Sequence, residues 1–419
     1  MPPTPRQRAR PALAAGACLV VALALAACGG GGGDDETNPR LREIDLTIGN
    51  LLPLSGTSKR LGESGEKASG LALSQIKLAI DGTASGNQRV RAIHRDEGGT
   101  ADTASEAAKE LTDEGAQCLT GPWSAAAVEQ TANDVAIPVT TLDISPVPAT
   151  AAVAELNDHD LINSTALPVS TEGMALADAI EQDLSGADSR TVDVASADDA
   201  YGDALAQDFT EEWQDRDGTV GGGSPDASLV IGEPDGFSEL ASSLSSGTGW
   251  DPEIAWGSDQ LVDPALPGVA GSQPVTGMRA LAPGAPDAED TNSFLAEEFK
   301  SAKPRGVELE PYAAQEFDAT VLCYLAAVAA GSTDGQQMAD ELIDITAPGG
   351  ERFTWQQLDG AVTALENGED IDYDGVSGPL DLDVQGNPTS GVFDVYRYGP
   401  AGLEVIGEVP AEKPNPATP

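Results

Sequence analysis

The feature that most constrains the fold of this chain is a regular alternation of strand-like and helix-like segments that begins near Ile44. Short apolar runs such as "IDLTIGNLLPL" and "RVRAIHRDE" are each followed by a segment with helical spacing of apolar residues, such as "ESGEKASGLALSQIKLAI". Strands that alternate with helices are joined by crossover connections, so they run parallel and helices cover both faces of the sheet. The sequence therefore predicts an α/β fold built on doubly wound parallel sheets.

The alternation occurs in two series, and this predicts two lobes. The first series ends with the strand-like "IPVTTLDI", and a second begins near Leu167 with helical "TEGMALADAIEQDL" and strand-like "TVDVASA". A chain of 419 residues is also longer than one hydrophobic core usually supports. The later part departs from the alternation, with helices predicted at "TNSFLAEEFK", "PYAAQEFDATVLCYLAAVAA" and "GQQMADELIDI", and then a hairpin with its turn at "QGN".

The first 41 residues have the layout of an export signal followed by a tether. Three arginines, Arg6, Arg8 and Arg10, precede an apolar run that is short for a membrane span and ends in small residues. The ending "LAAC" resembles the bacterial lipobox, which implies cleavage after residue 27 and a lipid on Cys28; a plain secreted cysteine is the alternative. Residues 28–41 are rich in glycine and polar residues and predict a flexible tether to the extracytoplasmic face of the cell membrane.

Charge and cysteine content restrict the partners of the chain. There are 69 Asp and Glu against 22 Lys and Arg, a formal net charge of -47, which disfavours nucleic acid and anionic lipid surfaces as partners. Cys118 and Cys323 lie in apolar segments, and we expect two buried thiols rather than a bridge, although export permits a disulfide.

The motifs of common enzymes are missing from the sequence. It has only two histidines, His94 and His159, and no G-x-S-x-G, H-E-x-x-H or phosphate-binding loop. We therefore expect a protein that is not an enzyme and that needs no cofactor.

The segment "DIDYDGVSGPLD" raises calcium binding as an alternative. It has Asp370, Asp372, Asp374 and Asp381 at positions 1, 3, 5 and 12 of an EF-hand-like loop. However, Ser377 replaces the usual aliphatic residue at position 8, and a strand-like segment follows instead of a helix. A solvated turn is the preferred interpretation, so we assign no metal.

Five segments in order along the chain carry a resemblance to a known family. The chain resembles the branched-chain amino-acid-binding family of ABC-transporter substrate-binding proteins, which have the type I periplasmic-binding fold. The segments are "IGNLLPLSGTSKRLGESGEKASGLAL", "LTGPWSAAA", "ASADDAYGDALAQDF", "EPYAAQEFDATVLCYLAAVAAGS" and "YDGVSGPLDLDVQGNPTSGVFDVYRY".

This resemblance implies two lobes that are joined by three crossovers and close on a small ligand. It places residues 42–166 and about 309–345 in lobe 1, and residues 167–308 and about 373–409 in lobe 2, with a Pro-rich tail over 410–419. A segment of lobe 2 that is usual in the family is missing between "DGTVGGG" and "PDASLVIG", which puts the lobe 2 contacts in more doubt than those of lobe 1.

Two groups of candidate ligand-binding residues lie in the predicted lobe 1. Ser124 opens a helix after a strand, where its hydroxyl and the N–H groups that follow could hold a carboxylate; a simple N-cap is the alternative. Family members often have a second serine where this chain has Ala125, which weakens the amino-acid interpretation. Asp143 and Ser145 end a strand at the sheet edge where open α/β folds bind ligands, and a loop role for Asp143 is the alternative.

The candidates in lobe 2 come from the resemblance. Tyr201 matches the tyrosine that covers the ligand, and Asp259 falls where the family has an acidic residue that receives the ligand's ammonium group. Leu61, Trp123 and Trp256 flank these segments and could line the pocket, although an aromatic residue is more often part of the core.

The sequence thus predicts a monomeric, lipid-anchored solute-binding protein. It would capture an amino acid or a similar polar metabolite and deliver it to the permease and ATPase subunits of an ABC transporter. Two alternatives remain open: a ligand-sensing module of the same fold, and a calcium-binding surface lipoprotein.

Overall fold

The computed structural model describes residues 43–83, 88–186, 190–222, 224–244, 249–271, 273–284 and 291–412, with side chains from residue 295 onward in the last range. The predicted signal peptide, the tether with Cys28 and most of the Pro-rich tail lie outside the described residues. Within the described ranges, none of the helices has both the length and the apolar character needed to cross a membrane.

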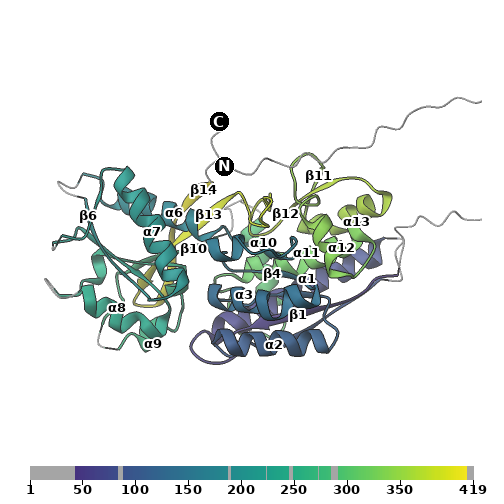
Figure 1. The fold of residues 1–419 in the computed structure, drawn as a ribbon, viewed down its shortest axis with the longest axis horizontal. Helices are drawn as coiled ribbons and strands as arrows, with labels where there is room; N and C mark the ends of the chain where they lie inside the picture. Colours follow the sequence, from purple (N-terminus) through teal and green to yellow (C-terminus); the bar gives the residue numbers. More distant parts are fainter. Residues whose placement is uncertain are drawn as a thin grey trace, which may run out of the picture. The chain divides into compact units, whose positions relative to one another are not determined.

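The first lobe is built on a five-stranded sheet in which every neighbouring pair is parallel (Figure 1). Its order is β2-β1-β3-β4-β5, so the chain reverses direction across the sheet after β2 and a topological switch point lies between β1 and β3. The strands are β1 (Asp45–Leu52), β2 (Arg89–Asp96), β3 (Cys118–Thr120), β4 (Leu142–Ser145) and β5 (Ile162–Ser164).

Helices from distant parts of the chain cover this sheet. The buried helix α11 packs against α1, and a small parallel pair formed by β11 and β12 adjoins α13. The helices are α1 (Lys59–Gly82), α2 (Ala101–Asp113), α3 (Ala125–Thr131), α4 (Ile137–Val139), α5 (Ala151–Ala154), α10 (Thr291–Ser301), α11 (Ala313–Ala330), α12 (Gly335–Leu342) and α13 (Leu358–Asn367), and the two strands are β11 (Glu351–Thr354) and β12 (Ile371–Asp374).

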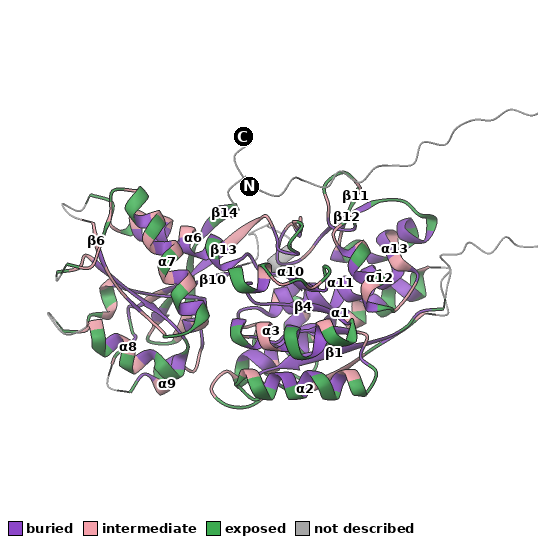
Figure 2. Ribbon diagram, in the orientation of Figure 1, coloured by how far each residue is buried: buried purple, intermediate pink, exposed green. Residues whose placement is uncertain are grey.

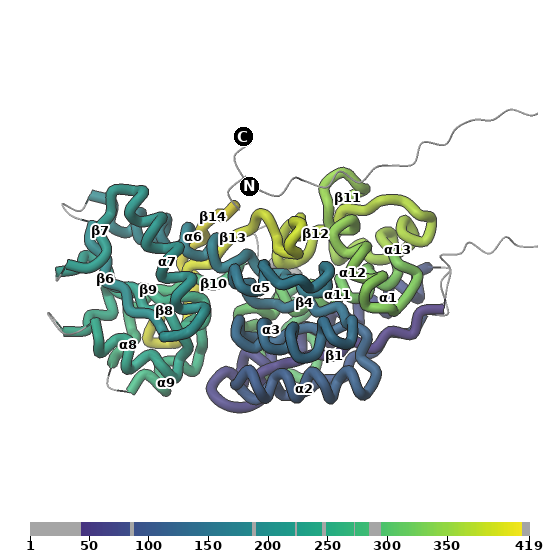
Figure 3. The backbone as a smooth tube through the Cα atoms, in the orientation of Figure 1, coloured from purple at the N-terminus to yellow at the C-terminus, as the bar shows by residue number. Residues whose placement is uncertain are grey.

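The second lobe has a seven-stranded mixed sheet of order β14-β13-β10-β9-β8-β6-β7. Five strands are parallel, and the C-terminal hairpin of β13 and β14 adds two antiparallel strands beside β10, as the backbone trace in Figure 3 shows. The strands are β6 (Thr191–Ser196), β7 (Thr219–Val220), β8 (Ala227–Ile231), β9 (Ala255–Gly257), β10 (Arg279–Pro283), β13 (Ser390–Gly399) and β14 (Gly402–Glu412), and the helices are α6 (Val169–Asp183), α7 (Ala200–Asp215), α8 (Phe237–Leu244) and α9 (Leu266–Val269).

The predicted α/β class with parallel sheets is confirmed, and two details differ from the expectation. The long hairpin turns between Gly399 and Gly402, whereas "QGN" makes a smaller turn in which the Gly386 N–H donates to the Asp383 carbonyl at 2.9 Å. In addition, Leu295 and Phe299 of α10 are buried in the same core cluster as α1 and α11. Helix α10 therefore packs with the core of the first lobe. Figure 2 colours each residue of the ribbon by its burial.

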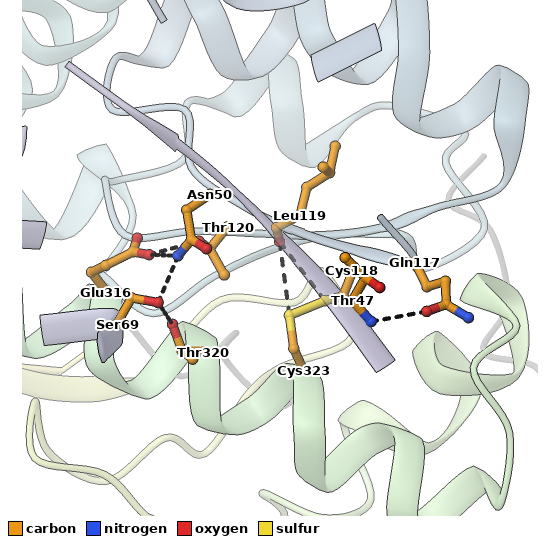
Figure 4. The surroundings of a disulfide bond; sticks show 10 residues. All are labelled: Thr47, Asn50, Ser69, Gln117, Cys118, Leu119, Thr120, Glu316, Thr320 and Cys323. Atoms are coloured by element: carbon orange, nitrogen blue, oxygen red, sulfur yellow. Dashed lines mark hydrogen bonds between the residues drawn. A yellow bond between two sulfur atoms is a disulfide. The ribbon is translucent and has the colours of Figure 1, made fainter. Parts of the chain in front are cut away.

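The expectation of two free thiols is wrong, because Cys118 and Cys323 form a disulfide (Figure 4). Cys118 is on β3 and Cys323 is on α11, with a Cα–Cα distance of 6.0 Å, and both are fully buried. The two residues are separated by 205 positions. Apolar surroundings alone therefore could not reveal that α11 returns to the first sheet directly over β3.

Candidate ligand-binding site

A cavity of about 230 Å³ opens at the carboxyl ends of the first-lobe strands, with part of its wall from the second lobe. This is the edge of a parallel α/β sheet at which ligands bind in open folds. The lining residues are Pro53, Ser55, Gly56, Thr57, Ser58, Leu61, Glu97, Gly98, Gly99, Thr100, Trp123, Ser124, Ala125, Ala127, Val147, Pro148, Tyr201, Glu233, Pro234, Asp235, Asp259, Gln260 and Tyr312.

The structure brings six of the eight predicted ligand-binding residues to this cavity: Leu61, Trp123, Ser124, Ala125, Tyr201 and Asp259. Ser124 is the N-cap of α3, and its hydroxyl oxygen accepts a hydrogen bond from the Ala127 N–H at 3.4 Å. The N-cap interpretation of Ser124 and its position in the cavity wall therefore both hold.

Asp143 and Ser145 do not line the cavity, because both side chains are covered. The Ser145 hydroxyl donates to the Pro122 carbonyl at 2.8 Å and fixes the loop before α3. Asp143 is 1 % exposed, neither of its carboxylate oxygens has a hydrogen-bond partner among the described residues, and burial raises its pKa. Trp256 is also a core residue, with the Arg279 guanidinium 4.8 Å from its ring centroid.

Asp259 is the centre of a buried polar cluster that joins the two lobes. The Tyr201 hydroxyl donates to Asp259 Oδ1, and the Gln260 N–H donates to the same oxygen at 2.6 Å. Tyr312, at the start of α11, also hydrogen-bonds the Asp259 carboxylate from the first lobe. The Asp259 N–H donates to Glu172 Oε1 at 2.9 Å.

Two carboxyl groups thus share one buried environment beside the cavity. Burial raises the pKa of both Glu172 and Asp259, and the Asp259 charge adds to the rise for Glu172. Sequence reasoning missed Glu172 and Tyr312. A signal was present for Glu172, since a glutamate on the apolar face of a helix that begins at Val169 needs a partner in the interior.

A third buried carboxyl group, Glu97, directly follows the last residue of β2. It is 5 % exposed, and its Oε2 accepts a hydrogen bond from the Trp123 N–H at 2.8 Å. Burial raises the pKa of Glu97 to about 8. The contact fixes the backbone of Trp123 at the cavity wall, and Trp123 in turn packs over Gly65 of α1, where a Cβ would lie 2.4 Å from the indole ring.

Glu316 on α11 is buried nearby under the first sheet (Figure 4). Its Oε1 accepts hydrogen bonds from Asn50 Nδ2 at 2.7 Å and from Thr120 Oγ1 at 2.6 Å. Burial nevertheless raises its pKa to about 8, because these two donors do not replace the lost hydration of the charge.

The raised pKa of Glu316 predicts a pH dependence of stability. Because the folded state binds the proton more tightly than the unfolded chain, the contribution of this group is full below pH 4.5 and is lost as the pH rises to about 8. The loss is about 1.4 kcal/mol per pH unit for such a group. Glu316→Gln keeps an acceptor oxygen for Asn50 and Thr120, so the free energy of unfolding should fall less steeply with pH in this variant.

Urea unfolding at pH 5, 6.5 and 8 measures this difference. Glu106→Gln is the matched control, because Glu106 is an exposed residue of α2. Its free energy of unfolding should change with pH as that of the unmodified chain does. Parallel pH curves for the unmodified chain and Glu316→Gln would show that Glu316 is already ionised in the folded protein.

The structure gives the candidate calcium segment a different set of contacts. Asp372 and Asp374 lie on β12, and Asp374 pairs with the Arg352 side chain. The turn that follows is held by Asp318, whose oxygens accept from the Val376 N–H at 3.0 Å and the Ser377 N–H at 2.8 Å. No group of three or more His, Cys, Asp or Glu side chains in the described ranges is placed to hold a metal ion.

Comparison with known proteins agrees with this architecture. Residues 45–235 match the family model described as periplasmic binding protein. The chemotactic signal transduction system substrate-binding protein BasB of Halobacterium salinarum is 25% identical over 382 residues, which cover 86% of this chain and 88% of that protein.

Solved structures show the same fold at lower sequence identity. The leucine-binding protein LivK of Thermotoga maritima has a TM-score of 0.66 and 17% identity, covering 88% of this chain and 99% of that one. LivJ of Streptococcus pneumoniae, in complex with isoleucine, has a TM-score of 0.66 and 15% identity over the same shares. A solute-binding protein of R. palustris, in complex with benzoate, has a TM-score of 0.61 and 18% identity, covering 88% and 98%. The resemblance inferred from the five sequence segments is confirmed.

Proposed function

We propose that this chain, which has the type I periplasmic-binding fold, is an extracytoplasmic solute-binding protein that captures one small polar ligand between its lobes. The observation that carries the proposal is the cavity at the carboxyl ends of the first-lobe strands, into which both lobes contribute buried polar side chains. Its volume of about 230 Å³ is that of roughly eight water molecules, which suits a small metabolite.

The partners that we propose are the permease and ATPase subunits of an ABC transporter. A lipid on Cys28 would hold the protein at the outer side of the cell membrane, with the glycine-rich segment as the tether. The buried Cys118–Cys323 disulfide supports an exported protein, because such bonds form and persist in oxidising compartments.

A sensory role is the second candidate, and one observation favours it. The relative from Halobacterium salinarum is named as part of a chemotactic signal transduction system and covers most of this chain. The ligand would be captured in the same way in both roles. The roles would differ in the membrane protein that binds this chain after its lobes have closed on the ligand.

The test is ligand binding to the full chain and to Asp259→Asn. We propose that the ligand carries an ammonium group, as an amino acid does, and that Asp259 receives it. Removing one partner of a buried charge pair costs about 2 to 5 kcal/mol, so Asp259→Asn should weaken binding about 30-fold or more.

Mass spectrometry identifies the solute that co-purifies, and calorimetry with that solute compares the two proteins. Asp203→Asn, an exposed residue of α7 that does not line the cavity, is the control and should bind like the unmodified chain. The proposal fails if no solute co-purifies and none of a panel of amino acids, amines, benzoates and fatty acids binds one to one. Equal affinities for the unmodified chain and Asp259→Asn would show that Asp259 does not contribute to ligand binding.

A further inference from the structure

The charges around the cavity are all of one sign. Four carboxylates line it: Glu97 and Asp259 are buried, and Glu233 and Asp235 are exposed at its rim. No lysine, arginine or histidine is among its lining residues in the described part of the chain. A ligand that enters this cavity therefore meets acidic groups, which become negatively charged as they lose their protons, and no fixed positive charge.

The basic side chains in the first half of α1 contact other groups of the protein. Lys59 directly follows the lining residue Ser58, and its ammonium lies 3.4 Å from Glu63. Arg60 follows the lining residue Ser58 by two positions, and its guanidinium pairs with Glu310 at 2.6 Å. Lys67 is buried, donates to the Val307 carbonyl at 3.0 Å and lies 4.3 Å from the ring centroid of Phe299. All three side chains have a partner in the protein, and none of them lines the cavity.

The groups that we expected to hold a carboxylate are uncharged, and one of them lies outside the cavity. Ser145 is buried outside the cavity, and its hydroxyl donates a hydrogen bond to the Pro122 carbonyl. The Ser124 oxygen accepts from the Ala127 N–H, so its own hydroxyl hydrogen is the one side-chain donor left at this position, and Ala125 stands where a second hydroxyl would be. Of the two ends of an amino acid, the structure thus provides for the cation and leaves the anion without a charged partner.

Aromatic side chains complete the wall around these carboxylates. Trp123 and Tyr312 lie edge to face with ring centroids 5.9 Å apart, and Tyr201 joins them from the second lobe. Three aromatic rings beside buried carboxylates are the surroundings that alkylated ammonium groups prefer, since the rings attract the cation and tolerate its apolar substituents.

We propose that the ligand of this cavity is a small organic cation without a carboxylate, such as an amine or a quaternary ammonium compound. This inference rests on the proposed solute-binding function and narrows its ligand class. It distinguishes this chain from the neighbours crystallised with isoleucine and benzoate, each of which carries a carboxylate.

When no cation is bound, the raised pKa of Glu97 means that its buried carboxyl group holds a proton more readily. Burial is the main cause of the raised pKa of Glu97, and the charges of Asp96, Glu233 and Glu316 add to it, while the Trp123 N–H bond opposes it. A cation bound beside Glu97 would reverse this rise and displace the proton.

The pKa of Asp259 is raised for the same physical reason. Burial is again the main cause of its raised pKa, with Glu172 beside it, and the Tyr201, Tyr312 and Gln260 donors oppose the rise. The affinity for a cation should therefore increase as the pH rises through about 8, where Glu97 loses its proton.

The experiment uses calorimetry on the full chain with matched probes. Choline is compared with 3,3-dimethylbutan-1-ol, which has its shape without the charge, and with glycine betaine, which adds a carboxylate. Butylamine is compared in the same way with butan-1-ol, and leucine and benzoate represent the ligands of the neighbours. We expect at least one cation to bind about 10-fold or more tightly than its neutral and carboxylate counterparts.

Two results would overturn the inference without affecting the proposed function. One is tighter binding of leucine, glycine betaine or benzoate than of either cation. The other is a co-purified solute that carries a carboxylate and binds one to one. Failure of every probe together with the absence of a co-purified solute would instead contradict solute binding itself.

Discussion

Replacing both Cys118 and Cys323 by alanine is expected to lower the free energy of unfolding by ~5 kcal/mol. The disulfide closes a loop with a sequence separation of 205 residues, and the chain-entropy estimate for a loop of that size is ~5 kcal/mol. The bond joins β3, near the centre of the first sheet, to α11, which covers that sheet. Its loss therefore frees the unfolded chain to sample many more arrangements, while the folded contacts change little.

Guanidinium unfolding of the oxidised chain, the reduced chain and the double alanine variant measures this effect. The reduced chain should resemble the variant, and a reductant should leave the variant unchanged. Equal midpoints for the oxidised chain and the variant would show that the bond contributes nothing beyond the packing of β3 against α11.

The parts of the fold that the sequence predicted are those encoded locally. Strand and helix periods along "RVRAIHRDE" or "TVDVASA" depend on neighbouring residues, so the elements and the parallel sheets could be inferred without knowledge of long-range contacts. The six cavity residues were predicted on different grounds. Ser124 and Ala125 begin a helix that follows a strand, where open α/β folds bind ligands, whereas Tyr201 and Asp259 came from the family resemblance and Leu61 and Trp123 from their places beside the matched segments.

What the sequence could not predict depends on which face a short strand presents and on distant partners. Strand β4 has only four residues, so alternation alone could not decide whether Asp143 and Ser145 face the cavity or the interior. Glu172 and Tyr312 gain their roles from Asp259, which is far away in the sequence. The disulfide and the placement of α10 required the same kind of long-range information.

The acidic segment after residue 370 shows how a local motif can be misleading. Its aspartates have the spacing of a calcium loop, yet β12 pairs with β11 and places Asp374 against Arg352. The turn after β12 needs a carboxylate, and it obtains one from Asp318 on α11.

Asp318→Ala is therefore expected to destabilise the protein by ~4 kcal/mol. The carboxylate accepts from the backbone N–H groups of Val376 and Ser377, from the Ser377 hydroxyl at 2.6 Å and from the Tyr373 hydroxyl at 3.1 Å. All four donors would lose their acceptor inside the protein, and each buried donor left unsatisfied costs about 1 to 3 kcal/mol, reduced where water enters the space.

Because of where this turn lies, Asp318→Ala should also change the susceptibility of the chain to proteolysis. Residues 375–377 begin the segment that leaves β12 for β13 in the other lobe, so Asp318 anchors one of the three crossovers. Limited proteolysis between β12 and β13 should accelerate in Asp318→Ala. Asp318→Asn keeps one acceptor oxygen and should lie between the two proteins in both measurements.

Asp344→Ala is the matched control, because this exposed aspartate lies in the turn after α12 in the first lobe. Its free energy of unfolding should stay within about 0.5 kcal/mol of the unmodified chain. If Asp318→Ala were as stable as this control, the four donors would have found water as a substitute. The crossover would then be held by the packing of Val376 and Leu380 in the first-lobe core rather than by the carboxylate.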